Sequence, residues 1–198
     1  MTAASNEPGP RYTVTLPFDP RRHYTVEEFA RLPEDNSFRY ELQDGVIVVS
    51  PRPVPRHQYA LAELYVQVRG QLPAQLAAFQ EVDVDLQLSR ARTRVPDLVI
   101  IPFDKIKQPG LQAASDLLVV VEILSPGSAR DDTEHKASEY AEAGVPQYWL
   151  IDPEPPVTAT ILTLVDGEYE ESQRAEHSFT VTEPCPLTID LDALQLFK

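Results

Sequence analysis

Two acidic residues stand in apolar stretches, where a carboxylate is costly to bury. Glu122 is the only charged residue of the run 117–124, and Asp97 stands near the start of the apolar run 95–101. A buried carboxylate without a partner costs several kcal/mol. A divalent cation shared by Asp97 and Glu122 would be such a partner, because Mg²⁺ prefers oxygen ligands and needs only one or two carboxylates beside water and substrate phosphate.

Each of these carboxylates also has a purely structural interpretation. Asp97 directly follows Pro96 and could cap a turn. Glu122 could form a salt bridge with an arginine or lysine at the edge of the core. The spacing of the residues leaves both alternatives open.

The elements that would position Asp97 and Glu122 follow from the hydrophobic pattern. Residues 95–101 and 117–124 are apolar almost throughout, which predicts central strands buried on both faces. Residues 130–143 predict a helix that ends at Gly144, and 147–151 predict a further strand. Beyond this strand we expect short strands and turns.

Earlier in the chain, the pattern predicts two helices, a hairpin and one more strand. Thr25 and Glu28 form a capping box that starts a helix, and Pro33 ends it. The other expected elements are a hairpin of strands 38–42 and 46–49, a helix over 57–69 and a half-buried strand over 82–88. The whole order predicts an α/β fold, a mixed β-sheet flanked by helices.

The length of 198 residues suits one domain. We expect a flexible N-terminal arm over residues 1–22 and a single domain over 23–198, whose C-terminal part is acidic and rich in strands. No stretch approaches the roughly 20 apolar residues of a membrane span, and no signal pattern opens the sequence, so we expect no membrane contact and a cytoplasmic location. Cys185 is the only cysteine, which excludes an intrachain disulfide.

The net charge of −14 is unevenly distributed. Residues 1–110 hold 13 basic and 14 acidic residues, whereas residues 111–198 hold 4 and 17. Proteins that bind nucleic acid usually carry a basic face. Such a face would have to lie in the first part of the chain, where the arginines include Arg21, Arg22, Arg31, Arg39, Arg52, Arg56, Arg69, Arg90, Arg92 and Arg94. These arginines could equally be ordinary solvated surface charges.

Several short motifs occur in an order that resembles a known family. They are Tyr40-Glu41-Leu42 with Gly45, Ser50-Pro51 with His57, Pro96-Asp97, Glu122-Ile123-Leu124-Ser125-Pro126, Asp132 with Lys136 and Tyr140, and Gly144 to Pro153. Their order and spacing resemble the Uma2 (DUF820) family of restriction-endonuclease-like proteins, which belongs to the PD-(D/E)xK nuclease-like superfamily. The resemblance runs from about Thr25 to Asp152.

This resemblance implies a metal-dependent endonuclease that hydrolyses phosphodiester bonds of nucleic acid, with DNA as the expected substrate. It implies that Glu41, Asp97 and Glu122 hold Mg²⁺ or Mn²⁺. Glu41 could instead be an exposed strand carboxylate that faces Arg39 or Arg94. A homodimer is expected, because cutting both strands of a duplex needs two sites. His57, Arg94 and Ser125 are candidates for contact with the substrate.

One position departs from the nuclease motif. The motif has a lysine two residues after Glu122, where this chain has Leu124. Lys136, on the following helix, is the natural substitute, and would position or activate the attacking water. Lys136 could instead be a surface lysine paired with Asp132. We expect Tyr140 and Trp149 to pack in the core.

Two other classes of function stay open. Leu124 and the net charge favour a non-catalytic protein that keeps the fold and binds a protein partner. A hydrolase that uses the same carboxylate and metal chemistry on another substrate is the second. A serine hydrolase is not expected, because Ser125 lacks the Gly-x-Ser-x-Gly pattern.

Overall fold

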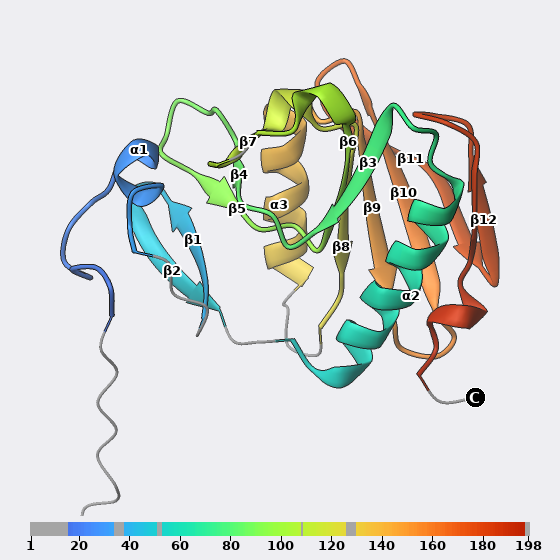
Figure 1. The fold of residues 1–198 in the computed structure, drawn as a ribbon. Coiled ribbons are helices and arrows are strands. Elements are labelled where there is room, and N and C mark those ends of the chain that lie inside the picture. The colour runs from blue at the N-terminus through green and yellow to red at the C-terminus, as the bar shows by residue number, and fades with distance from the viewer. Residues whose placement is uncertain (1–15, 34–37, 51–52, 108, 126–129, 197–198) are drawn as a thin grey trace, which may run out of the picture.

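The computed structural model describes residues 16–33, 38–50, 53–107, 109–125 and 130–196, with only the backbone described for 130–134 (Figure 1). Most of the predicted N-terminal arm, residues 1–15, lies outside this range. Its described end is packed on the domain: the Phe18 ring meets Tyr24 and Tyr40 edge-to-face. No helix in the described ranges has the length and apolar character that crossing a membrane requires.

The domain is built on a six-stranded mixed sheet with the strand order β11-β10-β9-β8-β6-β3. Its strands are β3 (Leu76–Gln80), β6 (Leu98–Pro102), β8 (Val119–Ile123), β9 (Gln147–Asp152), β10 (Thr158–Val165) and β11 (Glu168–Glu176). β8 and β9 are parallel, and every other neighbouring pair is antiparallel. The helix α3 (Arg130–Glu142) joins β8 to β9, as a parallel connection requires. The predicted α/β class and mixed sheet are confirmed.

Each face of this sheet has its own hydrophobic core. Helix α2 (Pro55–Gln71) packs on one face together with the C-terminal hairpin of β12 (Ser178–Val181) and β13 (Leu187–Asp190). Helix α3 packs on the opposite face (Figure 1). Because side chains alternate along a strand, Leu98 and Ile100 of β6 enter the first core, while Val99 and Ile101 enter the second.

Smaller elements surround the sheet. They include helix α1 (Val26–Phe29) and the hairpin of β1 (Arg39–Gln43) and β2 (Val46–Ser50). A three-stranded sheet consists of β4 (Val84–Asp85), β5 (Thr93–Arg94) and β7 (Gln112–Ala113). The 3₁₀ helices are η1 (Phe103–Lys105), η2 (Ala114–Asp116) and η3 (Asp192–Leu194). The predicted capping box is confirmed: the Thr25 hydroxyl accepts from the Glu28 backbone N–H, and Glu28 accepts from the Thr25 N–H.

Three predictions about strands need correction. The alternating pattern 82–88 forms only the two-residue strand β4, because the chain turns at Gln87, whose φ is +57°. Strand β3 was missed, because Leu76–Gln80 does not alternate and contains two alanines, which are poor strand formers. The strands β10 and β11 are long, with 8 and 9 residues, where short strands were expected.

The hairpin turn at Asp44 and Gly45 sets the position of β1. Gly45 has φ +84°, and a Cβ there would lie 3.0 Å from His23 Nδ1 and 3.3 Å from the Tyr24 carbonyl oxygen. The Tyr24 N–H donates to the Gly45 carbonyl at 2.8 Å. The turn therefore needs glycine both for its backbone conformation and for this close approach.

We expect Gly45→Ala to lower the free energy of unfolding by about 1–3 kcal/mol, because alanine is strained at positive φ. Gly70→Ala is the matched control, since a Cβ at this helical position meets nothing within 4 Å. It should raise stability by roughly 0.5–1 kcal/mol. Urea unfolding followed by circular dichroism measures both changes. Equal effects of the two substitutions would contradict this account of the turn.

Candidate active site

Asp97 and Glu122 lie side by side at the end of the neighbouring strands β6 and β8. The antiparallel register pairs Leu98 with Val121, and its continuation by one residue sets Asp97 opposite Glu122. Directly opposed residues have Cβ atoms roughly 5 Å apart. Both side chains face helix α3, and only 1% of Asp97 and 6% of Glu122 is exposed. The sequence therefore placed these two carboxylates correctly in buried strand ends.

Three donors hold the Asp97 carboxylate. Its Oδ2 accepts from the Ile123 backbone N–H at 2.7 Å and lies 3.0 Å from His57 Nε2. Its Oδ1 accepts from Arg39 Nη2 at 3.2 Å. These contacts replace the turn cap that was the structural alternative for Asp97.

Two residues of α3 hold the Glu122 carboxylate. Lys136 Nζ donates to Oε2 at 3.2 Å, and the Tyr140 hydroxyl donates to Oε1 at 3.2 Å. Lys136 and Tyr140 are one helical turn apart, so they lie on the same side of α3. The salt bridge expected as the alternative for Glu122 is thus present, and its partner is the lysine that the departure at Leu124 pointed to. The side chain of Asp132, the alternative partner of Lys136, lies outside the described residues.

The two carboxylates have opposite electrostatic environments. Burial alone would raise the pKa of Asp97, but His57, Arg39 and the Ile123 N–H outweigh it and hold the pKa below its usual value. For Glu122, burial dominates; Lys136 opposes it, the charge of Asp97 adds to it, and the pKa rises to about 7. One member of the pair is therefore firmly ionised, and the other sits close to its protonation point near neutral pH.

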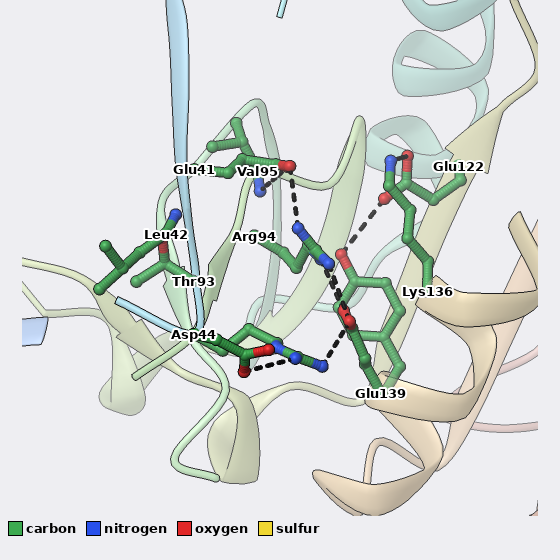
Figure 2. A network of polar contacts seen from close by, with 11 residues as sticks. Glu41, Leu42, Asp44, Thr93, Arg94, Val95, Glu122, Lys136 and Glu139 are labelled. Atoms are coloured by element: carbon green, nitrogen blue, oxygen red, sulfur yellow. Dashed lines mark hydrogen bonds and ion pairs between the residues drawn. The ribbon is translucent and has the colours of Figure 1, made fainter. Parts of the chain in front are cut away.

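Glu41 takes part in a different contact. Its Oε1 accepts from the Val95 backbone N–H at 3.0 Å, and its Oε2 accepts from Arg94 Nη1 at 3.1 Å. Arg94 also makes a two-pronged ion pair with Glu139 of α3, at 2.6 and 2.8 Å. Figure 2 shows this buried chain of contacts running from the β1–β2 hairpin through Arg94 to α3.

Arg92 extends the same chain of ion pairs. It donates to Glu139 at 2.6 Å and to Asp44 at 2.6 Å, so that Asp44 of the hairpin turn is tied to the helix that carries Lys136. The Leu42 backbone N–H donates to the Thr93 hydroxyl at 2.9 Å and fixes β1 against β5. The hairpin and α3 are thus positioned relative to each other by charge pairs (Figure 2).

Two predicted roles change in the light of these contacts. Arg94 was a candidate for contact with the substrate, but its side chain is only 4% exposed and is fully engaged by Glu41 and Glu139. The expected set of three carboxylate ligands is not assembled either: the described residues contain no group of three His, Cys, Asp or Glu side chains arranged to hold a metal. Glu41 is turned toward Arg94 instead.

Several of the arginines that could have formed a basic face instead form ion pairs within the protein. Arg22 pairs with Glu28 and Arg56 with Glu154, in addition to the pairs of Arg39, Arg92 and Arg94 described above. Arg21, Arg31 and Arg69 lie exposed on the surface.

The remaining predicted residues lie near the carboxylate pair. His57 is in the first turn of α2, where Pro55 starts the helix; its ring is 3% exposed, and its Nδ1 is buried without a hydrogen-bond partner among the described residues. Ser125 is half-buried and follows β8 by two residues. Contact of either residue with a substrate stays a prediction.

A divalent cation fits the donor set that Asp97 and Glu122 provide. Both are hard oxygen ligands on adjacent strands, and each carboxylate has about four lone-pair positions, of which the contacts above use two or three. The mutual repulsion of the two charges is a further reason for a cation between them. Glu41 is turned toward Arg94, so of the three expected ligands only Asp97 and Glu122 lie together.

Sequence reasoning missed three contributors to this site. Arg39, Tyr140 and Glu139 hold Asp97, Glu122 and Arg94 respectively. Tyr140 is fully buried, as predicted, but it also donates to Glu122. Its position four residues after Lys136, on the same side of a helix, was the signal available in the sequence.

Comparisons with known proteins agree with this architecture. The Uma2 family model, described as "Putative restriction endonuclease", matches residues 26–193. A solved structure from Anabaena variabilis ATCC 29413, described as "a putative nuclease belonging to DUF820", superposes with a TM-score of 0.66 and 22% identity, covering 86% of this chain and 97% of that chain. At this identity, the superposition shows that the two share a fold. No curated protein gives a significant match.

Removing Arg94 should strongly destabilise the protein. In Arg94→Met, Glu41 loses its charged partner, and Glu139 keeps only Arg92, so we expect a loss of about 3–5 kcal/mol in the free energy of unfolding. Arg174→Met is the control, because Arg174 forms an exposed pair with Glu171 that should contribute less than about 1 kcal/mol. Urea unfolding of both variants decides whether the buried chain of ion pairs supports the fold.

The raised pKa of Glu122 predicts a specific dependence of stability on pH. The folded value of about 7 lies above the ordinary value of 4.5, so the folded state takes up a proton between these limits. The stability of the wild type should therefore fall as pH rises from about 4.5 to 7. Glu122→Gln has no carboxyl group that titrates at this position. The difference in unfolding free energy between this variant and the wild type should therefore shift in favour of the variant by on the order of 3 kcal/mol as pH rises through that window.

The measurement is urea unfolding in EDTA at several pH values between 4 and 8. Glu168→Gln, at an exposed position of β11, is the control and should follow the wild type throughout. Parallel stability curves for the wild type and Glu122→Gln would show that the Glu122 carboxyl is not perturbed as described.

Proposed function

Because the family model covers most of its length, the chain belongs to the Uma2 family, and we propose that it is a metal-dependent endonuclease that hydrolyses phosphodiester bonds, with DNA as the substrate. One observation carries the proposal. Asp97 and Glu122 are buried as neighbours on adjacent strands, and the ammonium group of Lys136 contacts Glu122. A carboxylate pair can hold a divalent ion, and a lysine at its edge can stabilise charge on a phosphate, which together suit metal-assisted hydrolysis.

We propose Asp97 and Glu122 as the residues that hold Mg²⁺ or Mn²⁺. When bound, such an ion lowers the pKa of a coordinated water and neutralises charge on the phosphate oxygens. The Ile123 N–H and His57 keep the Asp97 carboxylate oriented and ionised. Arg39 holds the second oxygen of Asp97 and brings a positive charge to the same position.

Lys136 supplies the positive charge that the motif normally places two residues after the glutamate. Leu124 occupies that position, and its backbone N–H donates to the Ile151 carbonyl within the sheet. Lys136 reaches the same carboxylate from α3, and Tyr140 holds the other oxygen of Glu122. In this position Lys136 can orient the attacking water and stabilise the charge that develops on the phosphate.

A non-catalytic binding protein is the second candidate function. The internal pairing of Arg56, Arg92 and Arg94 favours it, because these three side chains are already engaged by carboxylates. We further propose a homodimer for the endonuclease, since cutting a duplex needs two sites; sedimentation equilibrium of the full chain tests it. The two candidate functions differ in whether the carboxylate pair binds a divalent ion.

The deciding experiment is calorimetric titration of Mn²⁺ and of Mg²⁺ into the full chain, with Asp97→Asn and Glu122→Gln in parallel. We expect the wild type to bind metal and both variants to lose binding. Glu154→Gln, at an exposed carboxylate outside the site, should bind as the wild type does. Absence of metal binding by the wild type, both alone and with duplex DNA, would overturn the endonuclease and favour the binding protein.

Lys136→Met should separate metal binding from catalysis. We expect metal binding to persist and the rate of metal-dependent DNA cleavage to fall by roughly 100-fold, as on removal of one group that stabilises charge in the transition state. Lys107→Met, at a half-exposed lysine paired with Asp116, should cleave at the rate of the wild type. Single-turnover cleavage of a labelled duplex measures both, and an unchanged rate in Lys136→Met would remove Lys136 from the mechanism.

A further inference from the structure

A groove of about 640 Å³ opens beside the carboxylate pair. Its walls are rich in aromatic side chains, among them Phe18, Phe38 and Tyr40. The Phe38 and Tyr40 rings meet edge-to-face with centroids 6.2 Å apart, and 39% of Phe38 is exposed. A second hollow of about 630 Å³, lined by residues of β9–β12, shares no residue with the groups that hold Asp97 and Glu122.

Three chain segments contribute residues both to the groove lining and to the surroundings of the carboxylate pair. Arg39, which binds Asp97, lines the groove itself. Gln58 lines it next to His57, and Val95 lines it two residues before Asp97. Arg39 therefore links the groove lining to the carboxylate pair through its contact with Asp97.

The groove is lined by both apolar rings and charged side chains. The aromatic rings provide apolar faces, and the guanidinium group of Arg39 is the one positive charge among the lining residues that the structure describes. The Nε of Arg39 is buried and has no hydrogen-bond partner within the described part of the chain. Glu81 and Asp83 also line the groove, and Glu81 Oε1 lies 3.8 Å from Arg39 Nη2. Their other carboxylate oxygens can accept hydrogen bonds from amino groups.

We propose that this groove binds one unpaired nucleotide of a nucleic-acid strand, next to the bond that the carboxylate pair would cleave. Phe38 and Tyr40 stack on the base, Arg39 binds the adjoining phosphate, and Glu81 and Asp83 accept from the amino groups of the base edge. The proposal rests on the proposed endonuclease function and adds a substrate subsite to it. The volume lies in the range of small-ligand sites and does not admit a duplex.

The unpaired state of the nucleotide follows from the aromatic walls. Inside a duplex both faces of a base are covered by its neighbours, so an aromatic side chain can stack only on a base that has left the helix or was never paired. Stacking also explains how a chain with a net charge of −14 could hold nucleic acid: the contact depends on the base as well as on the phosphate.

The test is the binding of a fluorescein-labelled single-stranded DNA oligonucleotide to the full chain, followed by anisotropy in EDTA at low salt. We expect Phe38→Ala to raise the Kd between about fivefold and a hundredfold, the loss typical of one stacked base. Phe103→Ala is the matched control, because Phe103 is 63% exposed and lies outside the groove lining. Its Kd should equal that of the wild type.

A second variant keeps every existing contact. Ala30 is an exposed residue of the groove wall, and Ala30→Glu adds a negative charge there; it should also weaken binding of the single strand. The same oligonucleotide as a duplex should bind more weakly than the single strand. An RNA strand that binds with the same dependence on Phe38 supports the same subsite.

Two results would overturn the subsite. One is a wild type that binds no single strand, and the other is binding that Phe38→Ala and Ala30→Glu leave unchanged. Because EDTA excludes metal-dependent cleavage, these results are independent of the proposed enzyme activity. If the wild type cleaves duplex DNA with Mn²⁺ but fails this binding test, the endonuclease function stands and the subsite is wrong. If binding depends on Phe38 but the protein never cleaves, the subsite stands and the endonuclease function is wrong.

Discussion

Two like charges buried next to each other, on Asp97 and Glu122, are the constraint on which the rest of the site depends. Strand pairing between β6 and β8 forces the two carboxylates together, and little water reaches either of them. Repulsion in such a place has to be offset by positive charge and hydrogen-bond donors. The protein recruits them from separate elements: Arg39 from β1, His57 from α2, and Lys136 with Tyr140 from α3.

The chain of ion pairs through Arg94 makes that recruitment possible. The β1–β2 hairpin is a sheet of its own, with no strand paired to the main sheet in the described structure, yet it carries Arg39 and must hold it against Asp97. Glu41, Arg94 and Glu139 tie the hairpin to α3 through a buried contact. Burying these charges is costly, so they specify one relative position of hairpin and helix rather than simply adding stability. The same helix then presents Lys136 to Glu122.

The position of Lys136 shows how the chemistry of a motif can be kept while its sequence pattern is lost. Residues two apart on a strand share a face, which is why the nuclease motif has glutamate and lysine at that spacing. Leu124 removes the lysine from the strand, but α3 crosses the same face of the sheet and supplies an ammonium group to the same carboxylate. What matters for the charge balance around Glu122 is where the nitrogen lies, not which element carries it.

The sequence by itself determined several of the central elements and the two central carboxylates. Apolar runs fixed β6, β8 and β9, the capping pattern fixed the start of α1, and a charge within an apolar run identified Glu122. Only the tertiary structure decided the partners. A contact of Glu41 with Arg39 or Arg94 was one alternative, but Glu139 is far from both Glu41 and Arg94 in sequence, so no local pattern could show that α3 completes the pairing. Burial and hydrophobic period are properties of single segments, whereas charge pairing depends on which segments the fold brings together.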